Sequence, residues 1–93
     1  MNENEKFANI LKVVRTRWNP KLTIRELSAL SGVSHPYISQ LENNKRDSLP
    51  KPEILFKLAT GFGKSNNKLV NHIYNLFMAS CNYISLDMDS ALS

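Results

Sequence analysis

The chain has 93 residues, 42% of them hydrophobic and 22% charged, which is typical of one small folded domain. Its formal net charge of +4 suits a polyanionic partner, although solubility alone also explains a mildly basic protein. A single cysteine, Cys81, excludes an internal disulfide framework and predicts a core thiol. Since the chain starts acidic and polar and has no apolar run of about 18 residues, we expect a cytoplasmic location and no membrane partner.

Positive charge is unevenly distributed along the chain. Residues 1–22 carry five basic and two acidic side chains, residues 23–47 carry three of each, and residues 48–68 carry four basic and one acidic. Residues 69–93 contain two aspartates and neither lysine nor arginine. This division predicts one part that faces a polyanion and a C-terminal part that faces something else.

A first helix is predicted over residues 5–18, because its apolar residues recur at the spacing of one helical face. These residues are Phe7, Ile10, Leu11, Val14 and Trp18. We expect Trp18 to anchor the core rather than to stack on a base. The helix should end before Pro20, since proline biases the residue before it away from helical geometry.

Residues 23–31 predict a second helix with a strong start signal. Thr23 and Glu26 fit the Ser/Thr-x-x-Glu capping box, in which each side chain accepts a hydrogen bond from a free backbone amide. Leu27 and Leu30 are expected to face inward. Gly32 then suits a left-handed turn position and should end the helix.

A third helix is predicted to begin directly after this turn. Ser34 is a favoured N-cap residue, and Pro36 is tolerated in a first helical turn. Ile38 and Leu41 continue the apolar face at a three-residue step. A helix, a short turn with glycine and a second helix form the helix-turn-helix motif, here residues 23–43, whose second helix enters the DNA major groove.

Two further helices are predicted after a polar loop in which Asn44 suits a left-handed position. Pro52 fits the first turn of a fourth helix, which Gly61 and Gly63 should stop. Residues 66–81 predict a fifth helix. The alternation of Ile84, Leu86 and Met88 with polar residues leaves three alternatives for the tail: packing on the fifth helix, an added strand, or disorder.

The apolar belt of the fifth helix is wider than the stripe that a surface helix needs. We therefore divide the chain into residues 1–65, a DNA-binding domain, and residues 66–93, a helix and tail for dimerisation. The alternative is a helix buried centrally in a monomer. The expected dimer residues are Val70, Ile73, Tyr74, Phe77, Met78 and Cys81.

Three segments resemble the XRE family, the phage-repressor and Cro type of helix-turn-helix protein: residues 23–34, 37–43 and 50–59. The resemblance spans about residues 7–63 and implies an all-α, compact five-helix, lambda-repressor-like domain. Ser28 and Asn44 stand where the family usually has alanine and glycine. The turn between the first two helices also looks about two residues longer than usual.

The expected DNA contacts fall into two groups. The predicted base-reading residues lie on the third helix: His35, Pro36, Ser39 and Gln40. Gln40 and His35 match base-reading positions of the family, and a glutamine side chain can pair with adenine. The predicted backbone contacts lie at helix ends and in the loop that follows: Thr23, Arg25, Ser34, Tyr37, Asn43, Lys45 and Arg46. For Tyr37, inward packing is an equal alternative.

The acidic Glu42 needs a partner on a helix that faces DNA. The resemblance implies an ion pair with an arginine of the first helix, and Arg15 is the better match, with Arg17 the alternative. A Glu42 that simply faces solvent is the other alternative. No cofactor, metal site or enzymatic activity is expected, because the sequence has no zinc-ligand spacing, phosphate loop or pairing of nucleophile with base.

These patterns predict a dimeric, sequence-specific transcriptional regulator, most simply a phage or mobile-element repressor on a near-palindromic double-stranded DNA operator. The alternative is a protein-interaction module on the same fold, either an antitoxin or an adaptor that inhibits another regulator. In that case the fifth helix would bind a different protein.

Overall fold

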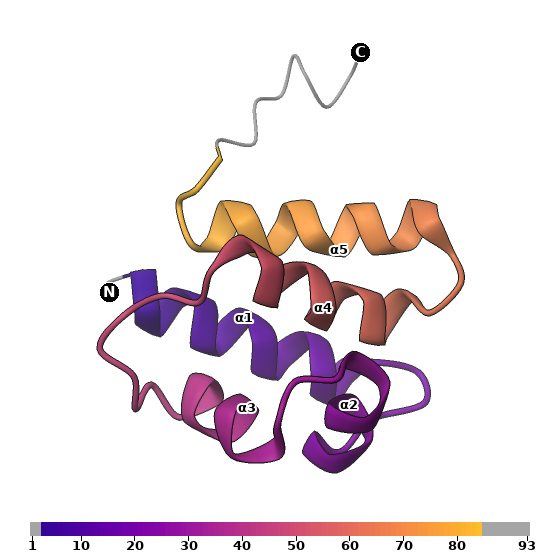
Figure 1. Ribbon diagram of the computed structural model, residues 1–93, viewed down its shortest axis with the longest axis horizontal. Coiled ribbons are helices and arrows are strands. Elements are labelled where there is room, and N and C mark those ends of the chain that lie inside the picture. Colours follow the sequence, from indigo (N-terminus) through magenta and orange to yellow (C-terminus); the bar gives the residue numbers. More distant parts are fainter. Residues whose placement is uncertain (1–2, 85–93) are drawn as a thin grey trace.

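The computed structural model describes residues 3–84, which form five α-helices. Their bounds are Glu3–Arg17 for α1, Ile24–Ser31 for α2, His35–Glu42 for α3, Pro52–Gly63 for α4 and Asn67–Ser80 for α5. In Figure 1, α1 crosses the middle of the molecule, with α2 and α3 below it and α4 and α5 above it. The predicted all-α, five-helix fold is confirmed. Most of the predicted tail, residues 85–93, lies outside the described residues.

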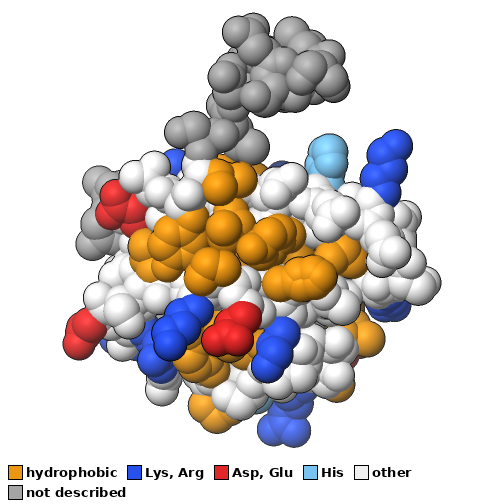
Figure 2. All heavy atoms as spheres, turned by 45° about the horizontal axis from the view of Figure 1, so that its top comes forward, with side chains coloured by type: hydrophobic (Ala, Val, Ile, Leu, Met, Phe, Trp, Pro, Cys, Tyr) orange, Lys and Arg blue, Asp and Glu red, His pale blue; other side chains and the backbone are white. Residues whose placement is uncertain are grey.

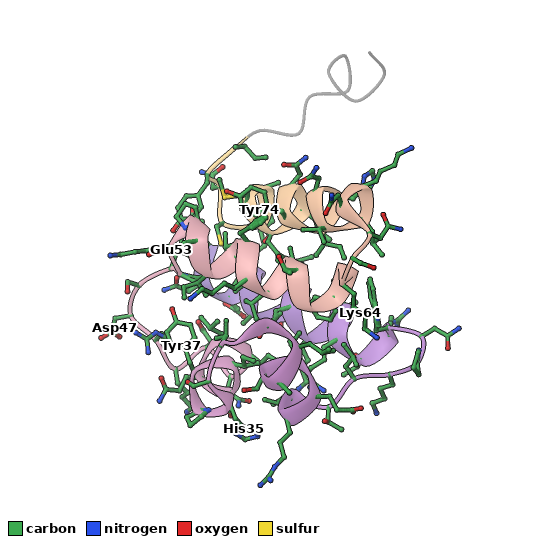
Figure 3. The ribbon with its side chains drawn as sticks, turned by 45° about the vertical axis from the view of Figure 1, so that its right-hand side comes forward. His35, Tyr37, Asp47, Glu53, Lys64 and Tyr74 are labelled. Atoms are coloured by element: carbon green, nitrogen blue, oxygen red, sulfur yellow. The ribbon has the colours of Figure 1, made fainter. Side chains whose placement is uncertain are left out.

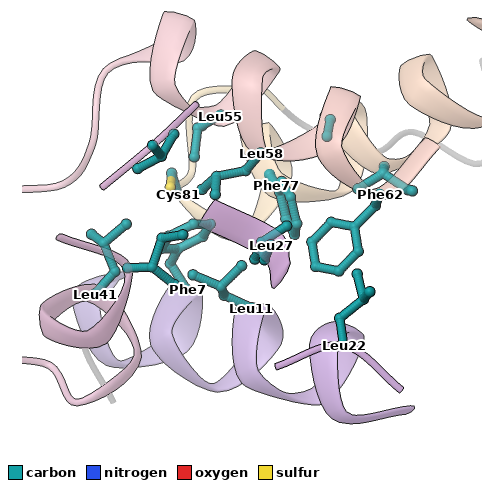
Figure 4. Close-up of a cluster of buried hydrophobic side chains, with 14 of the residues drawn as sticks. Phe7, Leu11, Leu22, Leu27, Leu41, Leu55, Leu58, Phe62, Phe77 and Cys81 are labelled. Atoms are coloured by element: carbon teal, nitrogen blue, oxygen red, sulfur yellow. The ribbon is translucent and has the colours of Figure 1, made fainter. Parts of the chain in front are cut away.

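Aromatic side chains from three helices meet in the core (Figure 4). Phe7 of α1 packs edge-on against Phe77 of α5, with ring centroids 5.6 Å apart, and Phe62 of α4 lies 6.1 Å from Phe77. Trp18 is half-buried and packs on Phe62 at 5.0 Å, which confirms its predicted role as a core anchor. Each fully buried side chain of this size stabilises the fold by about 1.5–3 kcal/mol.

The burial of α5 corrects the predicted dimer surface. Val70, Ile73, Phe77 and Cys81 are at most 6% exposed, so these four residues belong to the domain's own core. The reason is that α5 packs against both α4 and α1, and this contact takes up most of its wide apolar belt. Among the predicted dimer residues, Tyr74 and Met78 are only partly buried and keep some exposed surface.

Two further expectations were wrong. Leu30 is 42% exposed, because the eight-residue α2 buries only its Leu27 side fully. Gly61 does not stop α4, which continues to Gly63. A Cβ atom at position 61 would lie 2.9 Å from the Cβ atom of Ser31, so glycine is needed there for the close packing of α4 on α2.

The described residues form neither a membrane-spanning helix nor a metal-binding cluster. Within residues 3–84, no helix has the combination of length and apolar character that crossing a bilayer requires. Over the same residues, no three His, Cys, Asp or Glu side chains are grouped so that they could hold a metal ion.

Candidate nucleic-acid interface

The start of α2 is fixed by the predicted capping box. The amide of Glu26 donates to the hydroxyl of Thr23 at 3.0 Å, and the amide of Thr23 donates to the Glu26 carboxylate at 2.9 Å. The backbone hydrogen bond from Thr23 lowers the pKa of Glu26, since it favours the ionised carboxylate. At the other end, Gly32 adopts the expected left-handed conformation, with φ 77°, and its amide caps the carbonyl of Ser28.

The start of α3 also follows the sequence pattern. Ser34 is the N-cap, and its hydroxyl accepts a hydrogen bond from the Tyr37 amide at 3.3 Å. Pro36 lies in the first turn, where its missing amide hydrogen costs nothing. Ile38 and Leu41 are buried in the core, so the opposite side of α3 faces outward.

A buried ion pair holds the back of α3 against α1. The Arg15 guanidinium donates to both oxygens of Glu42, from Nε at 2.6 Å and from Nη2 at 2.8 Å. Its Nη1 donates to the carbonyl of Leu22 at 2.9 Å. The hydrogen bond and the charge of Glu42 raise the pKa of Arg15. The predicted pair is thus present with Arg15, and it fixes how α3 projects from the domain.

The predicted base-reading residues share the outward side of α3. His35, Pro36 and Gln40 are exposed, and Ser39 is half-buried. Figure 3 shows His35 at the edge of the molecule farthest from Tyr74, which lies beside α4 and α5. The surface on which the candidate base contacts lie is therefore separate from the α4–α5 surface.

Five of the seven predicted phosphate contacts are exposed. Thr23 and Arg25 are exposed at the start of α2, and Ser34 is exposed at the start of α3. Asn43 and Lys45 are exposed beyond the other end of α3, where the side-chain amide nitrogen of Asn43 donates to the Ser39 carbonyl at 2.8 Å.

The remaining two predicted phosphate contacts form a cluster with Gln40. The Arg46 guanidinium lies over the ring of Tyr37, 4.4 Å from its centroid, and donates to the Gln40 side-chain oxygen at 3.0 Å. Tyr37 is half-buried against the core, which agrees with the inward-packing alternative, and its phosphate contact stays a prediction. The sequence reasoning missed this cluster, because no spacing rule describes a loop that folds back on its own helix.

Comparison with known proteins places this fold in a family. A helix-turn-helix family model, HTH_3, matches residues 9–65. The HTH-type transcriptional repressor RghR of Bacillus subtilis (strain 168) is 44% identical over 55 residues. That match covers 59% of this chain and 38% of the relative, so the chain spans well under half of the relative's length. No solved structure matches the chain significantly.

The family model covers the whole arrangement described above, from the middle of α1 through α2, α3 and α4 to the turn before α5. This assignment also supports the prediction that the protein is not an enzyme. Because the matched residues make up more than half of the sequence, the chain belongs to the helix-turn-helix family, in its XRE type.

Proposed function

We propose that this protein is a sequence-specific DNA-binding transcriptional repressor. The observation that carries the proposal is the presentation of α3. Its inner side is held to α1 by the ion pair between Arg15 and Glu42, and its outer side exposes His35 and Gln40, the residues that we expect to read bases. A recognition helix needs this combination of fixed direction and exposed polar side chains. The name of the relative RghR supports repression as the mode of action.

The polar groups around α3 supply the attraction to the DNA backbone. Phosphate oxygens accept hydrogen bonds from basic side chains and from the free amides of helix starts. The proposed backbone contacts are Thr23, Arg25, Ser34, Tyr37, Asn43, Lys45 and Arg46, and the base contacts are His35, Pro36, Ser39 and Gln40. A protein of this kind works where the chromosome is, which agrees with the cytoplasmic location expected from the sequence.

We infer that the protein dimerises through the outer surface of α4 and α5. Figure 2 shows hydrophobic side chains gathered on this surface. Phe56 is 43% and Leu76 is 37% exposed, and the Phe56 ring meets Tyr74 edge-on at 5.4 Å. Exposed apolar patches of this kind mark interaction sites. Phe56 and Leu76 replace the four buried residues in the predicted dimer set, while Tyr74 and Met78 stay in it.

The test of the function is a selection of bound fragments from random double-stranded DNA. The proposal expects one enriched sequence. If the dimer binds one duplex, that sequence is near-palindromic, its half-sites lie about 34 Å apart and two protomers bind per site. Recovery of no preferred sequence, with binding that is the same on every fragment, would contradict the repressor proposal. One protomer per selected site would contradict the dimer alone.

The second candidate function is the interaction module, and the same α4–α5 patch favours it. In that case Leu76→Asp would abolish binding to another protein rather than self-association, and no DNA sequence would be enriched. Sedimentation of the purified protein at micromolar concentration separates the two cases, because only the dimer proposal expects twice the mass of the chain. The origin of the protein in a phage or mobile element stays a prediction from the sequence.

A further inference from the structure

We propose that Arg46 is a specificity-determining residue that orients the Gln40 amide so that α3 selects guanine at one base pair. This inference rests on the proposed DNA binding and adds which base Gln40 reads. Arg46 acts through Gln40 and is therefore a positioning residue for it. Its side chain reaches Gln40 because the loop after α3 reverses direction.

The reversal has three visible causes. Asn44, which follows the C-cap residue Asn43, adopts a left-handed conformation with φ 54°. The amide of Lys45 then donates back to the Gln40 carbonyl at 2.9 Å. The side-chain amide of Asn4, on α1, donates to the carbonyls of Arg46 at 3.5 Å and Asp47 at 3.3 Å. The loop backbone is therefore attached to both α3 and α1, so the position of Arg46 is set by the fold.

The Arg46 side chain is held between two residues of α3. Its guanidinium lies 4.4 Å from the centre of the Tyr37 ring, a cation–π contact, and its Nη1 lies 3.0 Å from Gln40 Oε1. Tyr37 is itself packed against the core. Gln40 and Arg46 then line an open hollow of about 360 Å³ together with Lys45, Asp47 and Ser48. The pair is thus both fixed in place and open to a ligand.

The chemistry of the pair decides what it can recognise. A guanidinium carries only hydrogen-bond donors, so Gln40 must turn its oxygen toward Arg46. The Gln40 nitrogen, with its two N–H groups, is left for the DNA. Bidentate pairing with adenine would need the same oxygen to accept a further hydrogen bond from adenine N6. Guanine presents two acceptors, N7 and O6, and so suits the two N–H donors that Gln40 has left.

Stability alone does not account for this placement of Arg46. Its Nε is buried, and it has no hydrogen-bond partner within the described residues 3–84. Leaving a buried donor unpaired costs free energy, and such groups are rare in folded proteins. Replacing Arg46 with methionine removes this unpaired donor and keeps the apolar part of the side chain. We therefore expect Arg46→Met to fold, which circular dichroism verifies.

The experiment uses the full chain and the DNA sequence that it selects. Gln40→Ala first identifies the base pair that Gln40 reads, as the one position where preference is lost. All four bases are then placed at that position and the affinity for each is measured. The wild-type protein should prefer guanine over adenine by roughly 5- to 150-fold, the range expected for one good bidentate contact.

Two variants separate the orienting role of Arg46 from its charge. Arg46→Met should lose most of the guanine preference at that position, because the Gln40 amide becomes free to rotate. Lys45→Met is the matched control, since it removes one positive charge from the same loop but should keep the preference. Both variants should weaken binding to all sequences and reduce its salt dependence alike.

A third variant keeps the inference testable if Arg46→Met does not fold. Gln40→Glu keeps a partner for Arg46 and offers only acceptors to the groove, so preference should change from guanine to cytosine, whose N4 is a donor.

An adenine preference in the wild-type protein, or an unchanged preference in a folded Arg46→Met variant, would overturn the inference but not the DNA binding. Failure to select any sequence would overturn the proposed function itself and this inference with it.

Discussion

The pair formed by Arg15 and Glu42 is the single contact on which the direction of α3 depends most. Both side chains are almost fully buried, with 11% and 3% of their surfaces exposed, and the guanidinium binds both carboxylate oxygens. Removing one member of a buried pair is costly, because the other charge then stays buried without compensation.

Arg15→Met should therefore lower the free energy of unfolding by about 3–5 kcal/mol, measured by urea denaturation. The double variant Arg15→Met/Glu42→Leu leaves no buried charge and should regain most of that loss. Equal stability of the wild-type protein and the single variant would show that the pair does not hold the two helices together.

The burial of the Cys81 thiol can be tested through its pKa. Burial raises the pKa of its thiol to about 11, against about 8.5 in an unfolded chain. The folded thiol should thus react slowly with an alkylating reagent at pH 8 and quickly in urea. Since the folded pKa is the higher one, its contribution to stability is complete below pH 8.5 and is lost as pH rises toward 11. Rapid labelling of the folded protein at pH 8 would contradict this burial.

At the scale of the helices, the features that depend on only a few neighbouring residues could be predicted from the sequence. The capping box at Thr23, the left-handed Gly32, the Ser34 cap and the first-turn Pro36 are all present, because each depends on local backbone chemistry. The same holds for the apolar stripe of α1, whose Phe7 and Leu11 are buried.

Features that depend on which helices pack against each other could not be predicted from the spacing of residues in the sequence. Periodicity shows that α5 has a wide apolar belt, but only its position against α4 and α1 shows that Val70 and Phe77 are core residues. Gly61 was expected to end α4, because its packing contact is with Ser31, thirty positions away in the chain, and sequence spacing does not reveal such a contact. The contact of Arg46 with Gln40 likewise depends on the path of a loop.

Gly61 also gives a prediction at this scale. In Gly61→Ala the new Cβ would lie 2.9 Å from the Cβ atom of Ser31 and 3.2 Å from a methyl carbon of Leu27, so α2 and α4 would have to separate. We expect a net loss of about 1–3 kcal/mol in urea denaturation, even though alanine favours helices.

The control for Gly61→Ala is Gly32→Asn. A Cβ atom at position 32 meets nothing within 4 Å, and asparagine tolerates the left-handed conformation there. This substitution should cost much less than Gly61→Ala. A larger loss at position 32 than at position 61 would contradict the close packing of α2 on α4.

At the scale of the whole molecule, the exposed side of α3 and the apolar surface over α4 and α5 are separate. Figure 3 shows His35 and Tyr74 on different sides, and Figure 2 shows the hydrophobic side chains gathered over α4 and α5. One molecule thus has room for DNA on α3 and for a second copy on α4 and α5, and we expect the two sites to respond to different variants.

Salt dependence tests the DNA side of this arrangement. Each lysine or arginine that neutralises a phosphate adds about 0.9 to the slope of log affinity against log salt concentration. Arg25→Ala should therefore reduce that slope by about one without changing sequence preference. Lys68→Ala, an exposed lysine of α5, should leave the slope unchanged. Equal effects of the two variants would mean that attraction comes from net charge alone.

Whether α3 reads base edges is decided by the variant Gln40→Ala. Binding of the wild-type and variant proteins is measured on the selected sequence and on unrelated DNA at the same salt concentration. The proposal predicts a loss of about 1–3 kcal/mol on the selected sequence and no change on unrelated DNA. Equal affinity of both proteins for the selected sequence, or an equal loss on both DNAs, would contradict base reading by α3.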